Sequence, residues 1–456
     1  GTVKCIEDEI PFELPEGWRW DRLGNVSIIA RGGSPRPIES YITDDENGIN
    51  WIKIGDTEKD GKYIFKTKEK IKPEGLSKSR YVESGDFLLT NSMSFGRPYI
   101  LRTDGCIHDG WLVIGNIDTV FNQDFLYYAL SSYFMYQTLS LLAAGSTVKN
   151  LKSDTVKSVL FPIPPMREQK RIAEKIDSLI SFVIKIESDK TDLQTTIQLT
   201  KSKILELAIR GKLVPQDPND EPASILLERI RTEKEELIKQ GKIKRDKKES
   251  VIFRGDDNSY YEKIGDTVTC IDEELPFDIP ENWAWIRLSS ACIINPKNNI
   301  SDDTLVSFVP MTLIQDGYAN EFTFEQRKWG EVKKGFTHFA ENDVGFAKIT
   351  PCFENRKSVV FRGLCNGYGA GTTELYILRT FPDTIMPEYI LYIVKTESFL
   401  VGGKQTCAGV VGQQRISKDY VCDYLVPVPP LNEQERIINK CAEIMTMLHN
   451  IEKSLS

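Results

Sequence analysis

The sequence predicts an α+β fold in which two pseudo-symmetric globular domains are joined by long antiparallel coiled-coil helices. Three observations lead to this prediction: an internal sequence repeat, a long heptad pattern of apolar residues, and short β-type runs interspersed with helical ones.

The internal repeat forms a frame around two dissimilar inserts. Residues 2–23 return as residues 267–288, and 13 of these 22 aligned residues are identical. Residues 161–172 return as 426–437 at the same offset of 265. The enclosed segments share only weak sequence similarity, such as that between residues 51–54 and 308–311. A kept frame with divergent inserts indicates two copies of one task on two different targets.

The frame continues into helices with a coiled-coil seam. Apolar positions step by alternating fours and threes, which is the spacing of heptads. In the first copy the seam is Ile172, Ile176, Leu179, Val183, Ile186, Lys190, Leu193, Ile197, Thr200, Ile204 and Leu207. In the second copy it is Ile437, Cys441, Ile444, Leu448, Ile451 and Leu455. An antiparallel pairing of the two helices is one solution, and packing of each helix on its own domain or on another chain is the alternative.

Short strands and helices are predicted inside each insert. The runs 86–89, 111–114 and 374–378 are apolar and bounded by turn residues, so they predict strands. Residues 125–142 and 387–400 predict helices. Between the copies, residues 215–262 predict a linker with a short helix over 224–240 and a charged run over 241–250, for which solvent exposure is favoured over DNA contact.

Composition limits the class of protein. The chain has 456 residues, enough for two domains with separate cores. Its apolar runs are too short to span a bilayer, so a cytoplasmic protein is expected. The nine cysteines form no CxxC pair and the three histidines are scattered, so no metal site is expected. The net charge of −8 argues against indiscriminate coating of a polyanion, but not against a local DNA-binding surface.

No catalytic signature is present in the sequence. A phosphate-binding GxxxxGK[ST] loop, an HExxH helix, a GxSxG elbow and the motif of amino-methyltransferases are all missing. The prediction is therefore a non-catalytic recognition protein.

Several motifs together carry a resemblance to a family. They are the Trp-containing openings at 14–23 and 279–288, the Gly-Gly-Ser-Pro turn at 32–35, the segment 144–150, the Pro-Pro helix starts at 162–169 and 427–434, and the exit at 211–216. With these motifs the chain resembles the specificity subunit of type I restriction-modification systems over essentially its whole length.

The resemblance implies a domain organisation and a function. It implies a first target-recognition domain (1–164), a central conserved helix (165–214), the linker (215–262), a second target-recognition domain (263–429) and a short C-terminal conserved helix (430–456). Each recognition domain would read one half of a split double-stranded DNA site. The implied partners are two methyltransferase subunits and the motor-nuclease subunits, which would hold S-adenosylmethionine, ATP and Mg²⁺; no cofactor is expected in this chain.

The helix pair is expected to act as a ruler between the two half-sites. The seam from Ile172 to Leu207 would span about 50 Å at 1.5 Å per residue. Two readers on one face of B-DNA prefer half-sites about 34 Å apart. The second helix ends about three turns earlier than the first when the copies are aligned, a departure from the family pattern that bears on the docking of one methyltransferase subunit.

Polar residues on loops are the candidates for DNA contact, because forked and amide side chains reach base edges while Lys, Ser and Thr hold phosphates. The alternative for each is an ordinary solvated loop residue. In the first copy the candidates are Arg31, Ser34, Arg36, Asn91, Ser92, Ser94, Arg97, Thr147, Lys149 and Asn150. In the second copy they are Lys297, Asn298, Asn299, Lys348, Thr350, Asn355, Arg356, Gln413, Gln414 and Arg415.

Two further sets belong to the frame. Glu168, Gln169, Glu433 and Gln434 are predicted either to face a methyltransferase or to cap their helices. Trp18, Trp20, Trp283 and Trp285 are predicted to pack in the core rather than to stack on bases. A second hypothesis of another class is a scaffold that binds protein through its coiled coil; DNA binding would weaken with salt and peptide binding would not.

Overall fold

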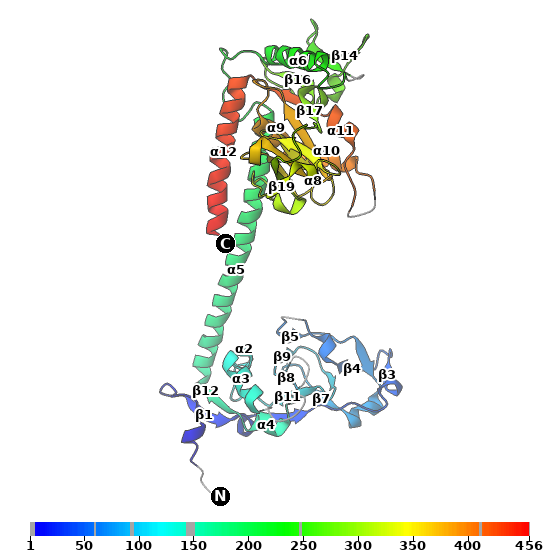
Figure 1. Ribbon diagram of the computed structural model, residues 1–456. Helices are drawn as coiled ribbons and strands as arrows, with labels where there is room; N and C mark the ends of the chain where they lie inside the picture. The colour runs from blue at the N-terminus through cyan, green and yellow to red at the C-terminus, as the bar shows by residue number, and fades with distance from the viewer. Residues whose placement is uncertain are drawn as a thin grey trace. The chain divides into compact units, whose positions relative to one another are not determined.

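The computed structural model describes residues 5–58, 61–91, 95–142, 151–245, 249–409 and 413–455 (Figure 1). The chain divides into two compact units, Gly1–Glu187 and Ser188–Ser456. Each unit combines β-sheets with helices, which confirms the predicted α+β class. The boundary falls inside the long helix α5 (Met166–Ile209), so α5 contributes residues to both units.

Unit 1 contains two five-stranded sheets with the orders β2-β11-β8-β9-β5 and β3-β6-β4-β10-β7. Apolar side chains of β8, β9 and β11 are fully buried and form the centre of the unit. The strands are β1 (Arg19–Arg22), β2 (Ile28–Arg31), β3 (Ile42–Thr43), β4 (Ile49–Ile52), β5 (Tyr63–Ile64), β6 (Glu69–Ile71), β7 (Arg80–Val82), β8 (Phe87–Thr90), β9 (Pro98–Leu101), β10 (Gly105–Ile107), β11 (Trp111–Gly115) and β12 (Leu160–Ile163). The helices before α5 are α1 (Leu23–Val26), α2 (Gln123–Ser131), α3 (Tyr133–Leu142) and α4 (Ser153–Lys157).

Unit 2 contains two four-stranded sheets with the orders β17-β24-β21-β22 and β19-β18-β23-β20. Its strands are β13 (Ser250–Arg254), β14 (Tyr260–Ile264), β15 (Thr267–Cys270), β16 (Ala284–Arg287), β17 (Cys292–Ile294), β18 (Leu305–Val309), β19 (Glu325–Lys328), β20 (Thr337–Ala340), β21 (Val344–Ala347), β22 (Ser358–Val360), β23 (Tyr368–Gly371), β24 (Leu375–Thr380) and β25 (Leu425–Val428). Its helices after α5 are α6 (Ala223–Lys239), α7 (Leu288–Ala291), α8 (Trp329–Val332), α9 (Pro387–Lys395), α10 (Glu397–Gln405), α11 (Lys418–Asp423) and α12 (Leu431–Ser454).

The two inserts share one strand topology although their sequences differ. The order β2-β11-β8-β9 corresponds to β17-β24-β21-β22, and β6-β4-β10-β7 corresponds to β19-β18-β23-β20. A parallel pair lies in the same place in both, β4 with β10 and β18 with β23. Trp111 opposite Thr90 matches Leu375 opposite Ala347 in register. The inserts are therefore structural copies whose loops have diverged.

A pair of frame strands closes each unit. Strand β1 pairs with β12 and β16 pairs with β25, and both antiparallel ladders have the same register at an offset of 265. The last arginine of each ladder repeats the same contacts: Arg22 donates to Glu9 and to the carbonyl of Ser158, and Arg287 donates to Glu274 and to the carbonyl of Asp423. The repeat seen in the sequence is thus a repeat of contacts.

The predicted insert helices are each broken into two. Ser132 separates α2 from α3, and Thr396 separates α9 from α10. Both residues have an extended backbone, and the hydroxyl of Thr396 accepts a hydrogen bond from the N–H of Phe399 at the start of α10. Since a Ser or Thr in this conformation starts a new helix, one helix over 125–142 or over 387–400 was the wrong prediction.

The frame helices pair antiparallel within unit 2. Glu452 near the end of α12 accepts from Gln198 and Lys201 on α5, while Glu433 at the start of α12 accepts from Gln216 just after α5. Ile204, Ala208, Ile437 and Cys441 lie in one apolar core. Figure 1 shows α12 beside the C-terminal half of α5. The antiparallel helix pair is confirmed for this part of α5.

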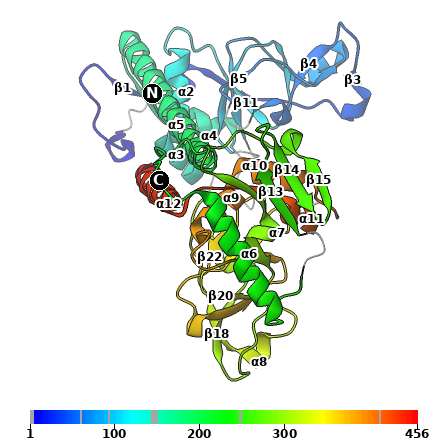
Figure 2. The ribbon, with the colours of Figure 1, turned by 90° about the horizontal axis from the view of Figure 1, so that it is seen from above.

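The end of the predicted linker is structured. After α6 the chain forms the three-stranded sheet β13-β14-β15, which packs on the frame through Ile252 and Trp285 (Figure 2). Trp283 and Trp285 are buried as predicted, while Trp18 and Trp20 are half-buried. Among the described helices none is long and apolar enough to cross a membrane.

Arg22 and Arg287 hold equivalent positions in the two units, so replacing each of them tests how much its ion pairs stabilise the frame. Arg287 also forms a two-point ion pair with Glu262, whose side chain is 8% exposed, whereas the Arg22–Glu9 pair is 34% exposed on both sides. Removing one partner of a buried pair leaves an uncompensated charge, while an exposed pair contributes little. We expect Arg287→Ala to lower the unfolding free energy of unit 2 by about 3 kcal/mol. Arg22→Ala should cost unit 1 at most about 1 kcal/mol. Hydrogen exchange resolved by unit measures both, and equal losses would contradict the assignment.

Candidate nucleic-acid interface

The candidate residues gather at one end of the main sheet in unit 1. Strand β2 ends at Arg31, β8 ends at Thr90 next to Asn91, and β11 begins at Trp111. Because β11 runs antiparallel to both neighbours, these three points lie at the same edge. Three loops that are far apart in sequence therefore meet there.

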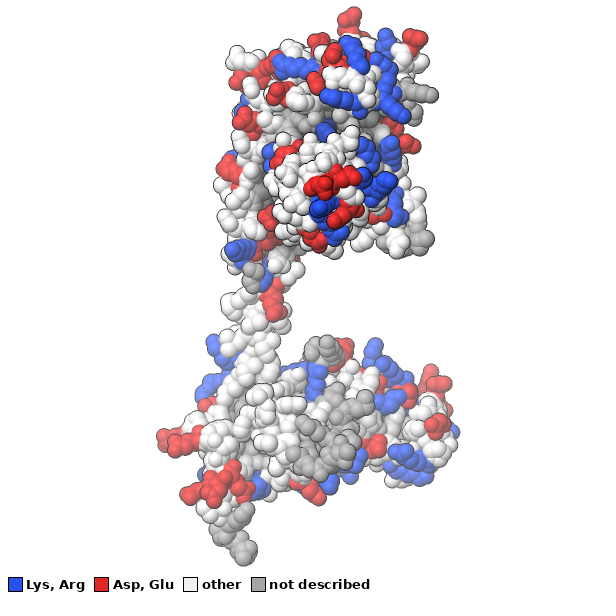
Figure 3. All heavy atoms as spheres, viewed as in Figure 1, with Lys and Arg blue, Asp and Glu red and all other residues white. Residues whose placement is uncertain are grey.

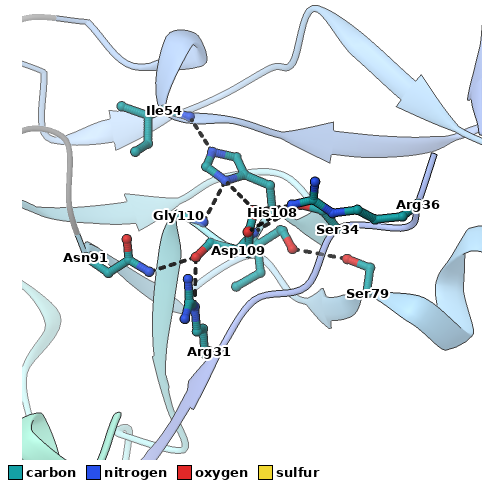
Figure 4. Close-up of polar contacts among 10 residues, drawn as sticks. Arg31, Ser34, Arg36, Ile54, Ser79, Asn91, His108, Asp109 and Gly110 are labelled. Atoms are coloured by element: carbon teal, nitrogen blue, oxygen red, sulfur yellow. Dashed lines mark hydrogen bonds and ion pairs between the residues drawn. The ribbon is translucent and has the colours of Figure 1, made fainter. Parts of the chain in front are cut away.

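Asp109 is the hub of this cluster (Figure 4). Its carboxylate accepts a hydrogen bond from Ser34 Oγ at 2.7 Å and lies 3.6 Å from the guanidinium of Arg36. Its backbone carbonyl accepts from Arg31 Nε at 2.9 Å and from Asn91 Nδ2 at 2.7 Å. The hydrogen bond from Ser34 lowers the pKa of Asp109. The structure thus brings four of the candidate residues, Arg31, Ser34, Arg36 and Asn91, together around Asp109.

The members of the cluster differ in exposure. The side chain of Arg36 is 80% exposed and Arg31 is exposed, whereas Asn91 is 1% exposed and acts as a support for the loop. Arg97 is half-buried and lies over the ring of Tyr99. Ser92, Ser94, Thr147, Lys149 and Asn150 lie outside the described residues.

His108 anchors the hub loop in an unusual way. The backbone N–H of Ile54 lies 3.1 Å from Nε2, and the N–H of Gly110 lies 2.7 Å from Nδ1. A neutral imidazole accepts at one ring nitrogen only, and an imidazolium accepts at neither. Burial lowers the pKa of His108, opposed by the nearby charge of Asp109. The loop that holds Asp109 is therefore built around an uncharged histidine.

In unit 2 the equivalent strand ends carry a second cluster. Strand β21 ends next to Lys348, β24 begins after Glu374, and the chain around Arg415 forms bridges with Ile349 and Ala408. Glu374 accepts from Nε and Nη2 of Arg415, each at 2.8 Å. Thr350 is buried and donates to the carbonyl of Gln414, Gln413 is exposed and Gln414 is half-buried. Lys348, Thr350, Gln413, Gln414 and Arg415 are thus brought together.

Two predicted readers of unit 2 have internal roles instead. Arg356 donates to the carbonyl of Lys395, pairs with Glu397 and lies over Tyr318, with only 18% of its side chain exposed. Asn298 donates to the carbonyl of Phe339 and accepts from Arg379. The low exposure of Arg356 and the two-sided contacts of Asn298 fit a supporting role inside the unit. Lys297, Asn299 and Asn355 remain exposed.

Three residues central to these clusters were missed by the sequence analysis, namely His108, Asp109 and Glu374. The sequence criterion selected side chains that can contact bases or phosphates, and imidazole and acidic side chains did not belong to that set. The signal in the sequence is that both acids stand just before an apolar strand run.

The helix starts of the frame are held internally. Gln169 donates to the carbonyls of Val120 and Pro164, and Gln434 donates to those of Thr384 and Pro429. Glu433 accepts from the indole of Trp283 at 3.0 Å. Gln169, Glu433 and Gln434 are fully buried and Glu168 is half-buried. The structure gives the three buried side chains a role in fixing the helix starts instead of facing a partner.

Charges on the face shown in Figure 3 are mixed in both units, with Lys and Arg interspersed among Asp and Glu. In the basic run 62–80, Lys62 pairs with Asp124, and Lys70 and Lys72 donate to the backbone carbonyls of Glu46 and Ser40. Within the described ranges no group of His, Cys, Asp and Glu has the arrangement of a metal site.

The arrangement of the two matched units indicates the class of protein. Two copies of one sheet-and-helix unit, matched in register but carrying different polar loops at the same edge, constitute a duplicated recognition protein. Residues 15–196 match the family described as type I restriction modification DNA specificity domain. In this part and in the segments aligned with curated relatives, the chain is similar to specificity subunits of type I restriction-modification systems.

Individual relatives agree with this placement. The chain is 46% identical over 267 residues to the Escherichia coli type I restriction enzyme EcoAI specificity subunit, and 45% identical over 258 residues to the EcoEI subunit. These alignments cover 58% and 56% of this chain but only 42% and 40% of the relatives. The fold resembles the HsdS subunit from Thermoanaerobacter tengcongensis, with a TM-score of 0.56, 18% identity, and coverage of 98% and 93% of the two chains.

The buried histidine predicts a pH dependence. Because the pKa of His108 in the folded chain lies below its ordinary value near 6.5, the unfolded chain binds the proton first as pH falls. The unfolding free energy of unit 1 should therefore decrease below about pH 6.5, by up to about 1.4 kcal/mol per pH unit. This pH-dependent decrease of the unfolding free energy should disappear in the variant His108→Gln. Denaturant titrations between pH 7.5 and 5 measure the slope, and an unchanged slope in the variant would refute the prediction.

Proposed function

We propose that this chain reads an asymmetric, two-part DNA site, with unit 1 on one half-site and unit 2 on the other. The observation that supports this most directly is the pair of matched strand edges. Equal register places equivalent loops at one edge of each sheet, and these loops carry different polar side chains. Two units of the same fold that carry different contact groups would select two unlike DNA sequences.

The chain would be the non-catalytic subunit of a larger complex. The relatives are named as specificity subunits of restriction enzymes. We infer that two methyltransferase subunits and the motor-nuclease subunits assemble on this chain, and that S-adenosylmethionine, ATP and Mg²⁺ are held by them. A scaffold that grips protein through its helices is the less favoured candidate, because it gives no role to the different polar loops that the two units carry at equivalent strand ends.

Selection from a random duplex library tests the central proposal. We expect the full chain to enrich DNA with two different half-sites of a few base pairs each, separated by a gap of fixed length and free sequence. Sequencing of the bound fraction gives the motif directly. A continuous motif, or two identical half-sites in inverted order, would contradict the assignment of one half-site to each unit.

The salt dependence of binding affinity distinguishes DNA recognition from the scaffold hypothesis. Each phosphate contact adds about 0.9 to the slope of log affinity against log salt. For four contacts, affinity should fall about a hundredfold between 50 and 200 mM salt. Fluorescence anisotropy with a labelled duplex measures this slope. A flat dependence would exclude a phosphate-based interface and leave the scaffold as the better account.

A further inference from the structure

Each unit places one carboxylate at the edge where the DNA-reading loops meet. Asp109 stands two residues before β11, and Glu374 stands directly before the equivalent strand β24. A negative charge at such an edge opposes the approach of phosphates, so it lowers charge-driven affinity. The recurrence of an acid at equivalent loops of two otherwise divergent inserts requires a compensating role.

In unit 2 that role is visible in one interaction. Both carboxylate oxygens of Glu374 accept from Arg415, at 2.8 Å each, which fixes the plane of the guanidinium. Arg415 is 47% exposed and Glu374 is 25% exposed, so the pair lies at the surface with the arginine on the outside. Hydrogen bonding from Arg415 lowers the pKa of Glu374, and Lys348 adds to the effect.

In unit 1 the acid orders a loop instead of a single side chain. The carboxylate of Asp109 holds Ser34, whose own Oγ accepts from the N–H of Asp109 at 3.3 Å. The exposed guanidinium of Arg36 lies 3.6 Å away on the same loop. This arrangement limits the positions available to Ser34 and Arg36 before any ligand arrives.

We propose that Asp109 and Glu374 are positioning residues for sequence readout. They order Ser34 and Arg36 in unit 1 and Arg415 in unit 2, so that less side-chain freedom is lost when a base edge is contacted. The acids reduce non-specific affinity and raise specific affinity. This inference rests on the proposed function, since it concerns how the same loops discriminate between DNA sequences.

The proposal is tested by two opposite changes in DNA affinity. In Glu374→Gln we expect affinity for the selected duplex to fall about tenfold, the size of a weakened bidentate base contact. Affinity for a scrambled duplex should rise about twofold, because one negative charge is removed. Competition binding with both duplexes measures the ratio. Asp109→Ala should act in the same way on the other half-site, and Asp109→Asn should be milder because an amide oxygen still accepts from Ser34.

A double-mutant cycle shows whether Glu374 acts through Arg415. In an Arg415→Ala background, Glu374→Gln should leave the discrimination ratio unchanged. The matched control is Glu325→Gln, which breaks an exposed Glu–Arg pair of the same charge on β19 and should leave the ratio unchanged. The melting temperature of each variant reports on folding separately.

The outcomes are distinguishable from failure of the proposed function. If the wild-type chain selects a two-part motif but Glu374→Gln binds both duplexes more tightly, or if the cycle is additive, the positioning role is wrong and DNA reading stands. If the wild-type chain selects no motif, both the reading and the positioning role are overturned.

Discussion

Closure of each unit by one pair of antiparallel strands is the constraint on which the rest of the structure depends. Strands β1 and β12, and likewise β16 and β25, bring the two ends of an insert to adjacent positions. The last arginine of each ladder and the buried glutamine at each helix start fix the same geometry twice. Between these fixed ends the insert needs only to preserve its strand register, so its loops are free to differ.

The sequence was sufficient for the parts of the fold that repeat. Identity in the frame and the heptad seam predicted the duplication, α5 and α12, because these features have a fixed period that is visible without coordinates. The common topology of the inserts was not predictable. Trp111 and Leu375 hold equivalent positions in their sheets, but that equivalence is set by backbone pairing between strands and leaves little trace in side-chain identity. The helix breaks at Ser132 and Thr396 were missed because local capping overrode an apolar pattern that continues through them.

The candidate site was predicted in part for a similar reason. Loop position and polar chemistry selected Arg31, Ser34, Arg36 and Asn91, which the structure places around one loop. The same criteria selected Arg356 and Asn298, whose polar groups are taken up by backbone carbonyls within unit 2. A sequence shows which side chains can make hydrogen bonds, but only the fold shows which of those bonds are already made. The acids Asp109 and Glu374 show the converse, since their importance follows from what they hold rather than from what they would contact.

The closing strands also impose an order on how each unit folds. The partner residues of these strands lie 138 to 144 positions apart along the chain in both units. Joining such distant segments costs about 4 kcal/mol of chain entropy, beyond a constant, when the intervening chain is unstructured. Collapse of the insert shortens this closure, so we expect the frame ladder to form on an insert that is already compact. Helix α5 is anchored at Ala173 in one core and at Ile204 in the other, while Leu179, Val183 and Ile186 between them are exposed, so loss of either insert would remove one of the two cores that hold this helix.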